Sequence, residues 1–207
     1  MDGYTGENRI VLRGQGMGTP ALSHRNHGVD YYVVPLRVPR LSGTDDVLNI
    51  VTADPDPQLW TAGQWVEVQG EVRSYNNRSG HGSKLVITVL ARSVQTDTAE
   101  EGENRLVLAG ALCRKPVVRR TPLGREICDL LLAVNRPYGR ADYLPCIAWG
   151  SLAAHCGEMD VGEKLRLEGR LQSRQYHKLI DGEQVARTAF EISVMNLLSD
   201  EDGVPFS

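Results

Sequence analysis

Four aromatic side chains in the second half of the chain could stack on nucleobases. They are Tyr138, Tyr143, Trp149 and Tyr176. Each lies near a predicted strand end, and the three tyrosines lie close to Arg, Gln or Asp residues. Rings at strand ends on one face of a small barrel, interleaved with arginine, would form a platform that stacks bases of any sequence. Packing in the barrel core is the alternative role, above all for Trp149, which precedes Gly150.

A basic segment precedes these aromatics, in the predicted turn region between the first two strands of the second half. It contains Arg114, Lys115, Arg119, Arg120 and Arg125, and no acidic residue interrupts it. Clustered cations attract phosphates even when the net charge of a chain is negative. The segment is therefore a candidate phosphate-binding rim, with a solvated loop as the alternative.

No combination of residues predicts a metal site or a catalytic centre. Cys113, Cys128, Cys146 and Cys156 are widely spaced and form no C-x-x-C pair, whereas zinc ligands are closely spaced. The glycines at 14, 16 and 18 do not match G-x-G-x-x-G, and no βαβ unit surrounds them. No His accompanies a Ser or Cys nucleophile in a recognisable arrangement. We expect no metal, no cofactor and no enzymatic activity.

The composition excludes two broad classes of protein. The chain has 207 residues, 23 Lys+Arg and 26 Asp+Glu, a net charge of −3 and four Cys. It is thus neither a disulfide scaffold nor a protein that coats nucleic acid through net charge alone. No stretch of about 18 apolar residues predicts a membrane helix, and the polar start of the chain predicts no signal peptide.

The chain repeats itself at an offset of 96 residues. The segment NRIVLRG at 8–14 recurs as NRLVLAG at 104–110, and Pro20 matches Pro116. With a slip of three residues, VEVQGEV at 66–72 matches LRLEGRL at 165–171. We predict two copies of one domain, at 1–96 and 104–199. The acidic segment 97–103 would be the linker, and 200–207 an acidic tip.

Within each copy the apolar residues alternate with polar ones, which is typical of half-buried strands. Strands are expected at 31–38, which Pro35 interrupts, at 127–134, at 85–90 and at 190–195, besides the repeated segments. A short helix is expected at 151–156, capped by Ser151, and 57–62 occupies the same place in the first copy. We predict an all-β protein with two tandem five-stranded OB-type Greek-key barrels, each with one short helix.

The first copy lacks the aromatic residues of the second. At the offset of 96, Ser42, Val47 and Ala53 stand in place of Tyr138, Tyr143 and Trp149, and only Tyr75 lies near the equivalent of Tyr176. The equivalent loop has fewer basic residues. We expect the second copy to bind nucleic acid and the first mainly to support it. Trp60 and Trp65 are expected to pack near the short helix.

The second copy resembles bacterial single-stranded DNA-binding proteins over residues 104–198. The most specific motifs are AWGSLA at 148–153 and VGEKLRLEGRLQSRQY at 161–176. Further matching segments are 104–110, Pro116, 122–124 and 132–136. The resemblance implies an OB fold, no enzymatic activity, and sequence-tolerant binding of single-stranded DNA in replication, recombination and repair.

The resemblance also implies roles for particular residues. Tyr138, Tyr143, Trp149 and Tyr176 fall where the family places base-stacking aromatics, and Arg105 and Arg174 fall where it carries phosphate-contacting residues. Arg136 is a further expected DNA contact. Ser151 departs from the pattern, because a Lys is common there.

The family resemblance further predicts partners and location. Asp200, Glu201, Asp202, Pro205 and Phe206 are similar to the acidic tip through which the family recruits replication and repair proteins, although Ser207 follows Phe206 and no long linker precedes the tip. Because the family commonly uses four OB folds, two tandem copies predict a homodimer. A bacterial cytoplasmic, nucleoid-associated location is expected.

Two other functions are compatible with the residues. An OB-fold adaptor in a replication or mobile-element complex would use the aromatics to contact protein. A single-stranded RNA binder would use the same platform, because an OB barrel alone does not distinguish RNA from DNA.

Overall fold

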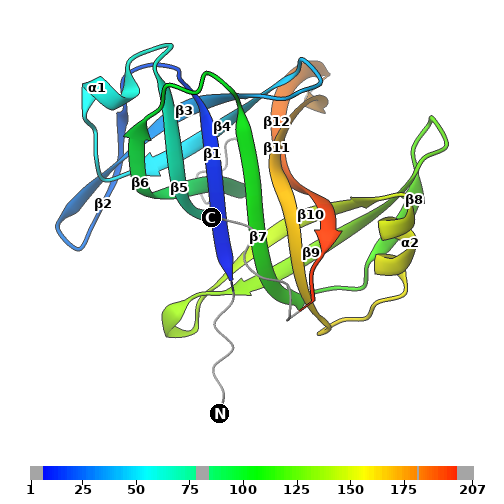
Figure 1. Ribbon diagram of the computed structural model, residues 1–207. Coiled ribbons are helices and arrows are strands. Elements are labelled where there is room, and N and C mark those ends of the chain that lie inside the picture. Colours follow the sequence, from blue (N-terminus) through cyan, green and yellow to red (C-terminus); the bar gives the residue numbers. More distant parts are fainter. Residues whose placement is uncertain (1–6, 78–83, 181, 200–207) are drawn as a thin grey trace. The chain divides into compact units, whose positions relative to one another are not determined.

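The computed structural model describes residues 7–77, 84–180 and 182–199, and it contains the predicted repeat as two matching series of elements (Figure 1). The first series is β1 (Asn8–Gly16), β2 (Ala21–Asn26), β3 (Val29–Pro39), β4 (Asp45–Thr52), α1 (Pro57–Trp60), β5 (Trp65–Asn76) and β6 (Leu85–Thr96). The second is β7 (Glu103–Leu112), β8 (Val117–Arg120), β9 (Glu126–Asn135), the 3₁₀ turn η1 (Pro137–Gly139), β10 (Ala141–Trp149), α2 (Ser151–Gly157), β11 (Lys164–Ile180) and β12 (Glu183–Leu197).

Five strands of each series close into a ring, which confirms the predicted pair of five-stranded OB-type barrels. In the N-terminal barrel, β1 pairs with both β3 and β5, β3 with β4, β4 in parallel with β6, and β6 with β5. In the C-terminal barrel, β7 pairs with β9 and β11, β9 with β10, and β10 in parallel with β12, which neighbours β11. Each ring carries one added strand, β2 on β3 and β8 on β9, that the sequence did not predict.

Contacts divide the chain into two compact units whose limits differ from those of the repeat. One unit contains residues 9–105 together with 172–189. The other contains residues 106–171 together with the residues before 9 and after 189. Within the first unit, the backbone N–H of Ser173 on β11 donates to the buried carboxylate of Asp46 on β4 at 2.7 Å. The domain limits at 1–96, 97–103, 104–199 and 200–207 stay a prediction, and residues 200–207 lie outside the described part.

Alternating apolar residues mark the strands that close each ring, and their buried side chains fill each barrel. On β9, Leu130, Leu132 and Val134 are buried, and the residues between them are half-buried. Gly110 explains why the repeated segment ends in glycine, since a Cβ at this position would lie 2.4 Å from the Ala133 carbonyl oxygen across the β7–β9 closure. The repeated glycine therefore permits the close approach that shuts the ring.

Pro35 does not interrupt β3, because it lies where the ladder has a gap. On that side of β3, β2 pairs as far as Val33 and β1 pairs from Leu36, so no N–H is needed at position 35. The Pro35 carbonyl still accepts a hydrogen bond from the Met17 N–H at 3.1 Å.

The predicted helices are present, but one predicted cap is wrong. Gly150, with φ 58°, is the N-cap of α2, and no side chain caps this helix. The N–H of Gly150 donates to the Glu126 carbonyl at 3.0 Å, so contact with β9 fixes the start of α2 and Ser151 becomes its first helical residue. The indole of Trp60 on α1 is buried as expected and donates to the Asp54 carbonyl at 3.0 Å.

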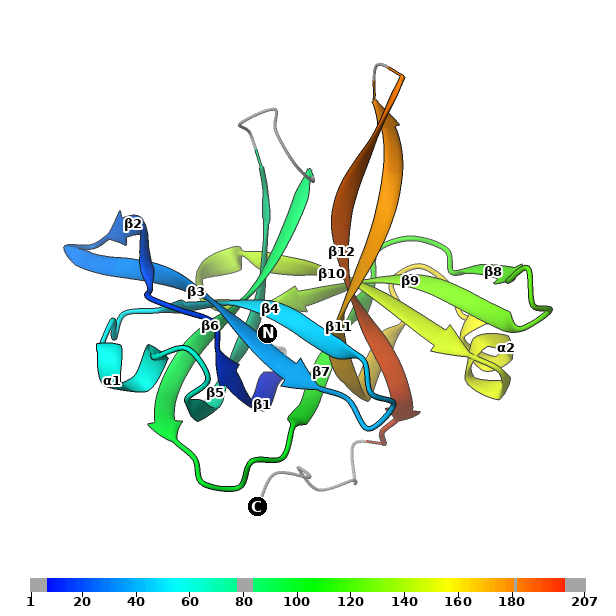
Figure 2. The same ribbon diagram turned by 90° about the horizontal axis from the view of Figure 1, so that it is seen from above.

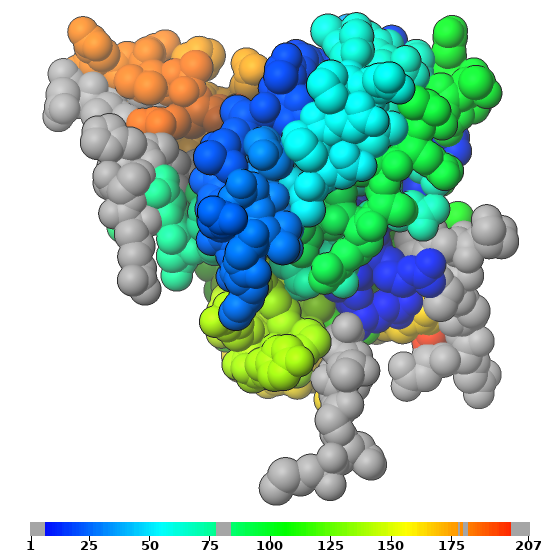
Figure 3. Space-filling view, turned by 90° about the vertical axis from the view of Figure 1, so that its left-hand side faces the viewer, coloured from blue at the N-terminus to red at the C-terminus, as the bar shows by residue number. Residues whose placement is uncertain are grey.

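Figures 2 and 3 show parts of the N-terminal barrel from two further sides. β5 and β6 extend as a two-stranded ribbon in Figure 2. In Figure 3 the cyan α1 region adjoins the blue β2–β3 region on the same surface. None of the described helices is long and apolar enough to cross a membrane.

Candidate nucleic-acid interface

Tyr143 and Trp149 lie on the same face of β10, pointing away from the barrel core. They are six residues apart on a strand with unbroken register, and side chains alternate between the two faces of a strand. Leu144, Cys146 and Ala148 are buried on the opposite face. Tyr143 is 50% exposed and Trp149 is 40% exposed, so both rings are available to a ligand.

The added strand β8 brings Arg119 to the same face. Ile127 on β9 pairs with Trp149 on one side and with Arg119 on the other, so the three residues form one row across three strands. Two strand spacings place the Arg119 and Trp149 backbones about 10 Å apart. We call Tyr143, Trp149 and Arg119 the aromatic face.

Arg119 is held in place by one carboxylate. Its Nε and Nη2 donate to Asp129 at 2.5 and 3.1 Å, and these hydrogen bonds raise the pKa of the guanidinium. Both side chains are partly exposed, and two hydrogen bonds to one carboxylate fix the orientation of the guanidinium. Arg119 is therefore held on the aromatic face.

The other members of the basic segment point in several directions. Arg120 lies on the face opposite to Arg119 and pairs with Glu126 at 3.0 Å. Lys115 pairs with Asp160 at 3.3 Å, and the backbone N–H of Val161 and then Lys115 lower the pKa of that carboxyl. Arg114 and Arg125 are exposed. The segment is thus a short strand with its flanking turns, and its role in binding phosphates stays a prediction.

Tyr138 stands on the turn η1 at the other end of β10. It is almost fully exposed and has a φ of 64°, a left-handed conformation that is uncommon for a tyrosine. The turn connects the ends of β9 and β10, two residues along the hairpin from the Tyr143–Ala133 pair. Tyr138 therefore extends the exposed aromatic surface beyond the strands.

Arg136 is committed to a structural contact. It donates to both oxygens of Asp142, which is completely buried. Arg105, on β7, is half-buried. The phosphate-binding roles of Arg105 and Arg136 stay predictions, and the geometry gives Arg136 a second role in holding the η1 turn.

Tyr176 and Arg174 lie on β11, in the segment 172–189 that groups with the N-terminal barrel. The Arg174 guanidinium carbon is 5.8 Å from the centroid of the Tyr176 ring, within cation–π distance. The two residues thus form a local pair that belongs to the other compact unit from the aromatic face.

The N-terminal barrel contains a ring pair that the sequence analysis missed. His24 on β2 and Tyr31 on β3 are paired across the strands and stack at 5.1 Å with an interplanar angle of 7°. The comparison at the offset of 96 considered only the positions that are aromatic in the second copy, and neither His24 nor Tyr31 corresponds to one of them. Alternation along 31–38 would have placed Tyr31 on the face away from buried Val34 and Leu36.

No metal or cofactor position emerges from the described part of the chain. There, no three His, Cys, Asp or Glu side chains are grouped as metal ligands. The four thiols are unpaired, and burial raises the pKa of Cys156 to about 11. The predicted partner-binding residues Asp200, Glu201, Asp202, Pro205 and Phe206 lie outside the described residues.

Comparisons with known proteins bear on the family and the fold of the chain. The model of the single-strand binding protein family matches residues 103–198. The chain is 34% identical over 108 residues to single-stranded DNA-binding protein 3 of Listeria innocua, an alignment covering 48% of this chain and 67% of that protein. It is 36% identical over 80 residues to a single-stranded DNA-binding protein of Halalkalibacterium halodurans, covering 35% of this chain and 48% of that relative, about half its length.

A solved structure extends the similarity to the whole chain. The single-stranded DNA-binding protein of Thermus aquaticus superimposes with a TM-score of 0.76 at 22% identity, covering 98% of this chain and 97% of that one. This match supports the fold with two OB-like barrels. The matched family consists of binding proteins that are not enzymes, as the sequence analysis expected. The chain therefore belongs to the single-strand binding protein family.

Proposed function

We propose that this protein binds single-stranded DNA without sequence specificity, through bases stacked on the C-terminal barrel and phosphates held by arginine. The observation that carries the proposal is the row on the aromatic face, where Trp149 and Arg119 flank the buried Ile127 and Tyr143 lies further along β10. Base–aromatic stacking contributes about 1–3 kcal/mol per base and accepts every base. The relatives named above, which are single-stranded DNA-binding proteins, support the same function.

Three finer statements belong to the same proposal. The protein acts in replication, recombination and repair in the bacterial cytoplasm, near the nucleoid. It forms a homodimer that presents four OB folds to DNA. Residues 200–207 recruit replication and repair proteins. Sedimentation equilibrium of the full chain tests the dimer, and a monomer at micromolar concentration would contradict it.

A fluorescence titration of the full chain with oligo-dT tests DNA binding directly. Trp149 is exposed on the aromatic face, whereas Trp60 is buried and Trp65 is half-buried on β5 of the other barrel. We expect binding to quench the emission, the quench to shrink in Trp149→Phe, and the quench to persist in the control Trp65→Phe. Affinity should fall steeply as salt rises, because phosphate contacts release counterions.

Two outcomes would favour a different function. Tight binding of poly-U that oligo-dT cannot displace would favour single-stranded RNA. Absence of binding to any single strand by a folded protein would reject the proposal and favour an adaptor whose aromatic face contacts protein.

Tyr143→Ala should weaken oligo-dT binding by about 1–3 kcal/mol if the ring stacks on a base.

A further inference from the structure

The turn between β8 and β9 holds a leucine in an exposed and well-defined position. Leu123 is 86% exposed. The Gly124 N–H donates to the Thr121 carbonyl at 2.8 Å, and the Thr121 N–H donates to the Arg125 carbonyl at 2.9 Å. Pro122 precedes the leucine and fixes its own φ. Leu123 is thus displayed by its backbone rather than by side-chain packing, and the turn extends above α2 in Figure 1.

Arginines flank this apolar tip on both faces of the β8–β9 ribbon. Arg119 lies on the aromatic face and Arg120 on the opposite face, because adjacent residues of a strand point to opposite sides. They form ion pairs with Asp129 and Glu126 that are partly exposed to solvent. Arg125 follows the turn, is exposed, and forms no ion pair with any other described residue. A ligand at the tip would meet cations on either side of a leucine.

The tip continues from the Trp149 end of the aromatic face. Trp149 and Arg119 share the row through Ile127, and the next pair, Arg120 with Glu126, closes β8 directly below the turn. The Gly150 N–H also binds the Glu126 carbonyl. A DNA strand stacked on Trp149 and leaving the barrel at this end would reach Leu123 next.

We infer that Leu123 is a wedge that engages the first base pair of a duplex joined to the bound single strand. The inference rests on the proposed binding of single-stranded DNA. Proteins that kink DNA insert apolar side chains such as leucine or proline between base steps and partly unstack them. The Pro122-Leu123 tip offers such side chains, and Arg119, Arg120 and Arg125 supply cations for the adjacent phosphates. The ligand chemistry is a single-strand/duplex junction rather than a particular sequence.

The matching turn of the N-terminal barrel lacks an exposed apolar residue. It connects β2 and β3 through His27 and Gly28, both at positive φ, and has no apolar residue at its tip. The wedge is therefore a property of the second copy. Leu41, in the β3–β4 turn of the first copy, is also fully exposed and supplies a matched control.

The test uses the full chain and a short duplex with an oligo-dT overhang. A 2-aminopurine in the first base pair reports loss of stacking as a rise in emission, and overhangs of both polarities are compared. We expect wild type and Leu41→Ser to raise the emission to a similar extent. The rise with Leu123→Ser should be at most about one third of the wild-type rise. Binding of Leu123→Ser to oligo-dT without a duplex should stay within about twofold of wild type, since no base pair is present to wedge.

The outcomes separate this inference from the proposed function. If wild type binds oligo-dT but leaves the junction base pair stacked, or if Leu123→Ser opens it equally well, the wedge is rejected and DNA binding stands. If no variant binds oligo-dT, both are rejected. If Leu123→Ser loses oligo-dT affinity as strongly as junction opening, Leu123 is a general stacking contact and the wedge is again rejected.

Discussion

Arg136 and Asp142 form a bidentate ion pair that recurs in the other barrel as Arg40 and Asp46. In the C-terminal barrel, Arg136 Nε donates to Asp142 Oδ2 at 2.6 Å, and Nη2 reaches Oδ1. In the N-terminal barrel, Arg40 reaches the two oxygens of Asp46 at 2.7 and 2.5 Å. Both carboxylates are buried, and both pairs join the ends of a strand hairpin. The repeated residues at these positions preserve a turn in each copy.

Removing Arg136 should therefore destabilise the fold. Arg136→Gln removes the cation that pairs with a buried carboxylate, and we expect the free energy of unfolding to fall by about 3–5 kcal/mol. The control Arg120→Gln removes an exposed pair and should cost less than about 1 kcal/mol. Urea unfolding followed by circular dichroism compares them. Equal losses in the two variants would contradict the structural role of Arg136.

Arg119 and Arg120 should differ in their contribution to DNA binding, although they are neighbours. Only Arg119 lies on the aromatic face with Trp149. In titrations with oligo-dT across a range of salt concentrations, Arg119→Gln should reduce the slope of log K against log salt by about 0.7, the value for one phosphate contact on a single strand. Arg120→Gln should leave the slope unchanged. Identical slopes in both variants would mean that the face of β8 does not determine phosphate contact.

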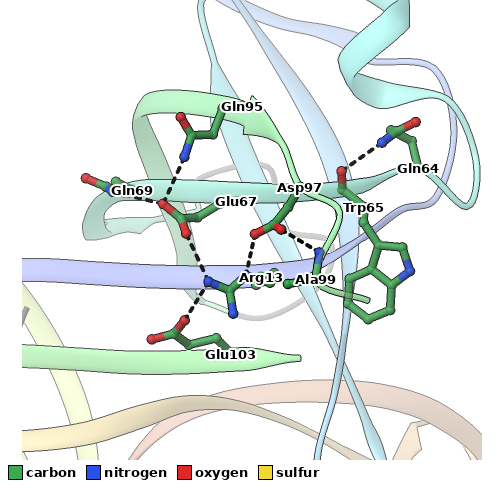
Figure 4. Close-up of polar contacts among 9 residues, drawn as sticks. All are labelled: Arg13, Gln64, Trp65, Glu67, Gln69, Gln95, Asp97, Ala99 and Glu103. Carbon is green, nitrogen blue, oxygen red and sulfur yellow. Dashed lines mark hydrogen bonds and ion pairs between the residues drawn. The ribbon is translucent and has the colours of Figure 1, made fainter. Parts of the chain in front are cut away.

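Asp97 should make stability fall in acid. Figure 4 shows its carboxylate accepting hydrogen bonds from the Ala99 N–H, at 2.7 Å, and from Arg13 Nε, at 2.5 Å. The Ala99 N–H first, and then Arg13, lower the pKa of Asp97 below its ordinary value, although burial acts in the opposite direction. A lowered folded pKa gives stability that is full above the unfolded pKa, about 3.9, and is lost as pH falls through the folded pKa.

We expect Asp97→Asn to lose part of this dependence. Its unfolding midpoint in urea should change less steeply below about pH 4 than that of wild type. Arg13→Gln should flatten the same region partially, because the Ala99 N–H remains. A variant that retains the full wild-type slope would exclude Asp97 as its source.

The thiols should react in an order set by burial. Cys128, Cys146 and Cys156 are buried and Cys113 is half-buried. Burial raises the pKa of Cys146 strongly and that of Cys156 to about 11, so little thiolate forms near neutral pH. A disulfide reagent at about pH 8 should modify Cys113 first and the others only after denaturant is added. The rapid modification of one thiol should disappear in Cys113→Ser. Rapid reaction of all four thiols in the folded protein would contradict their buried positions.

Local patterns in the sequence were sufficient to predict the barrels. Alternation along 127–134 and the repeated glycines reflect constraints that act on single strands, because one face of each strand is buried and the ring must close. The strands β2 and β8 were missed, since β2 is exposed throughout and β8 has only four residues. Neither carries the alternation that marks a half-buried strand.

The sequence by itself determined the repeat, the fold, the family and the aromatic residues that could stack on bases. Only the tertiary structure decided which of them share a face: pairing through Ile127 puts Arg119 beside Trp149 and sends Arg120 away. It also joined Arg136 to Asp142 and grouped Tyr176 with the other compact unit. The physical reason is that periodicity records how one strand meets the core, whereas a binding surface depends on strand register and hydrogen bonds between distant segments.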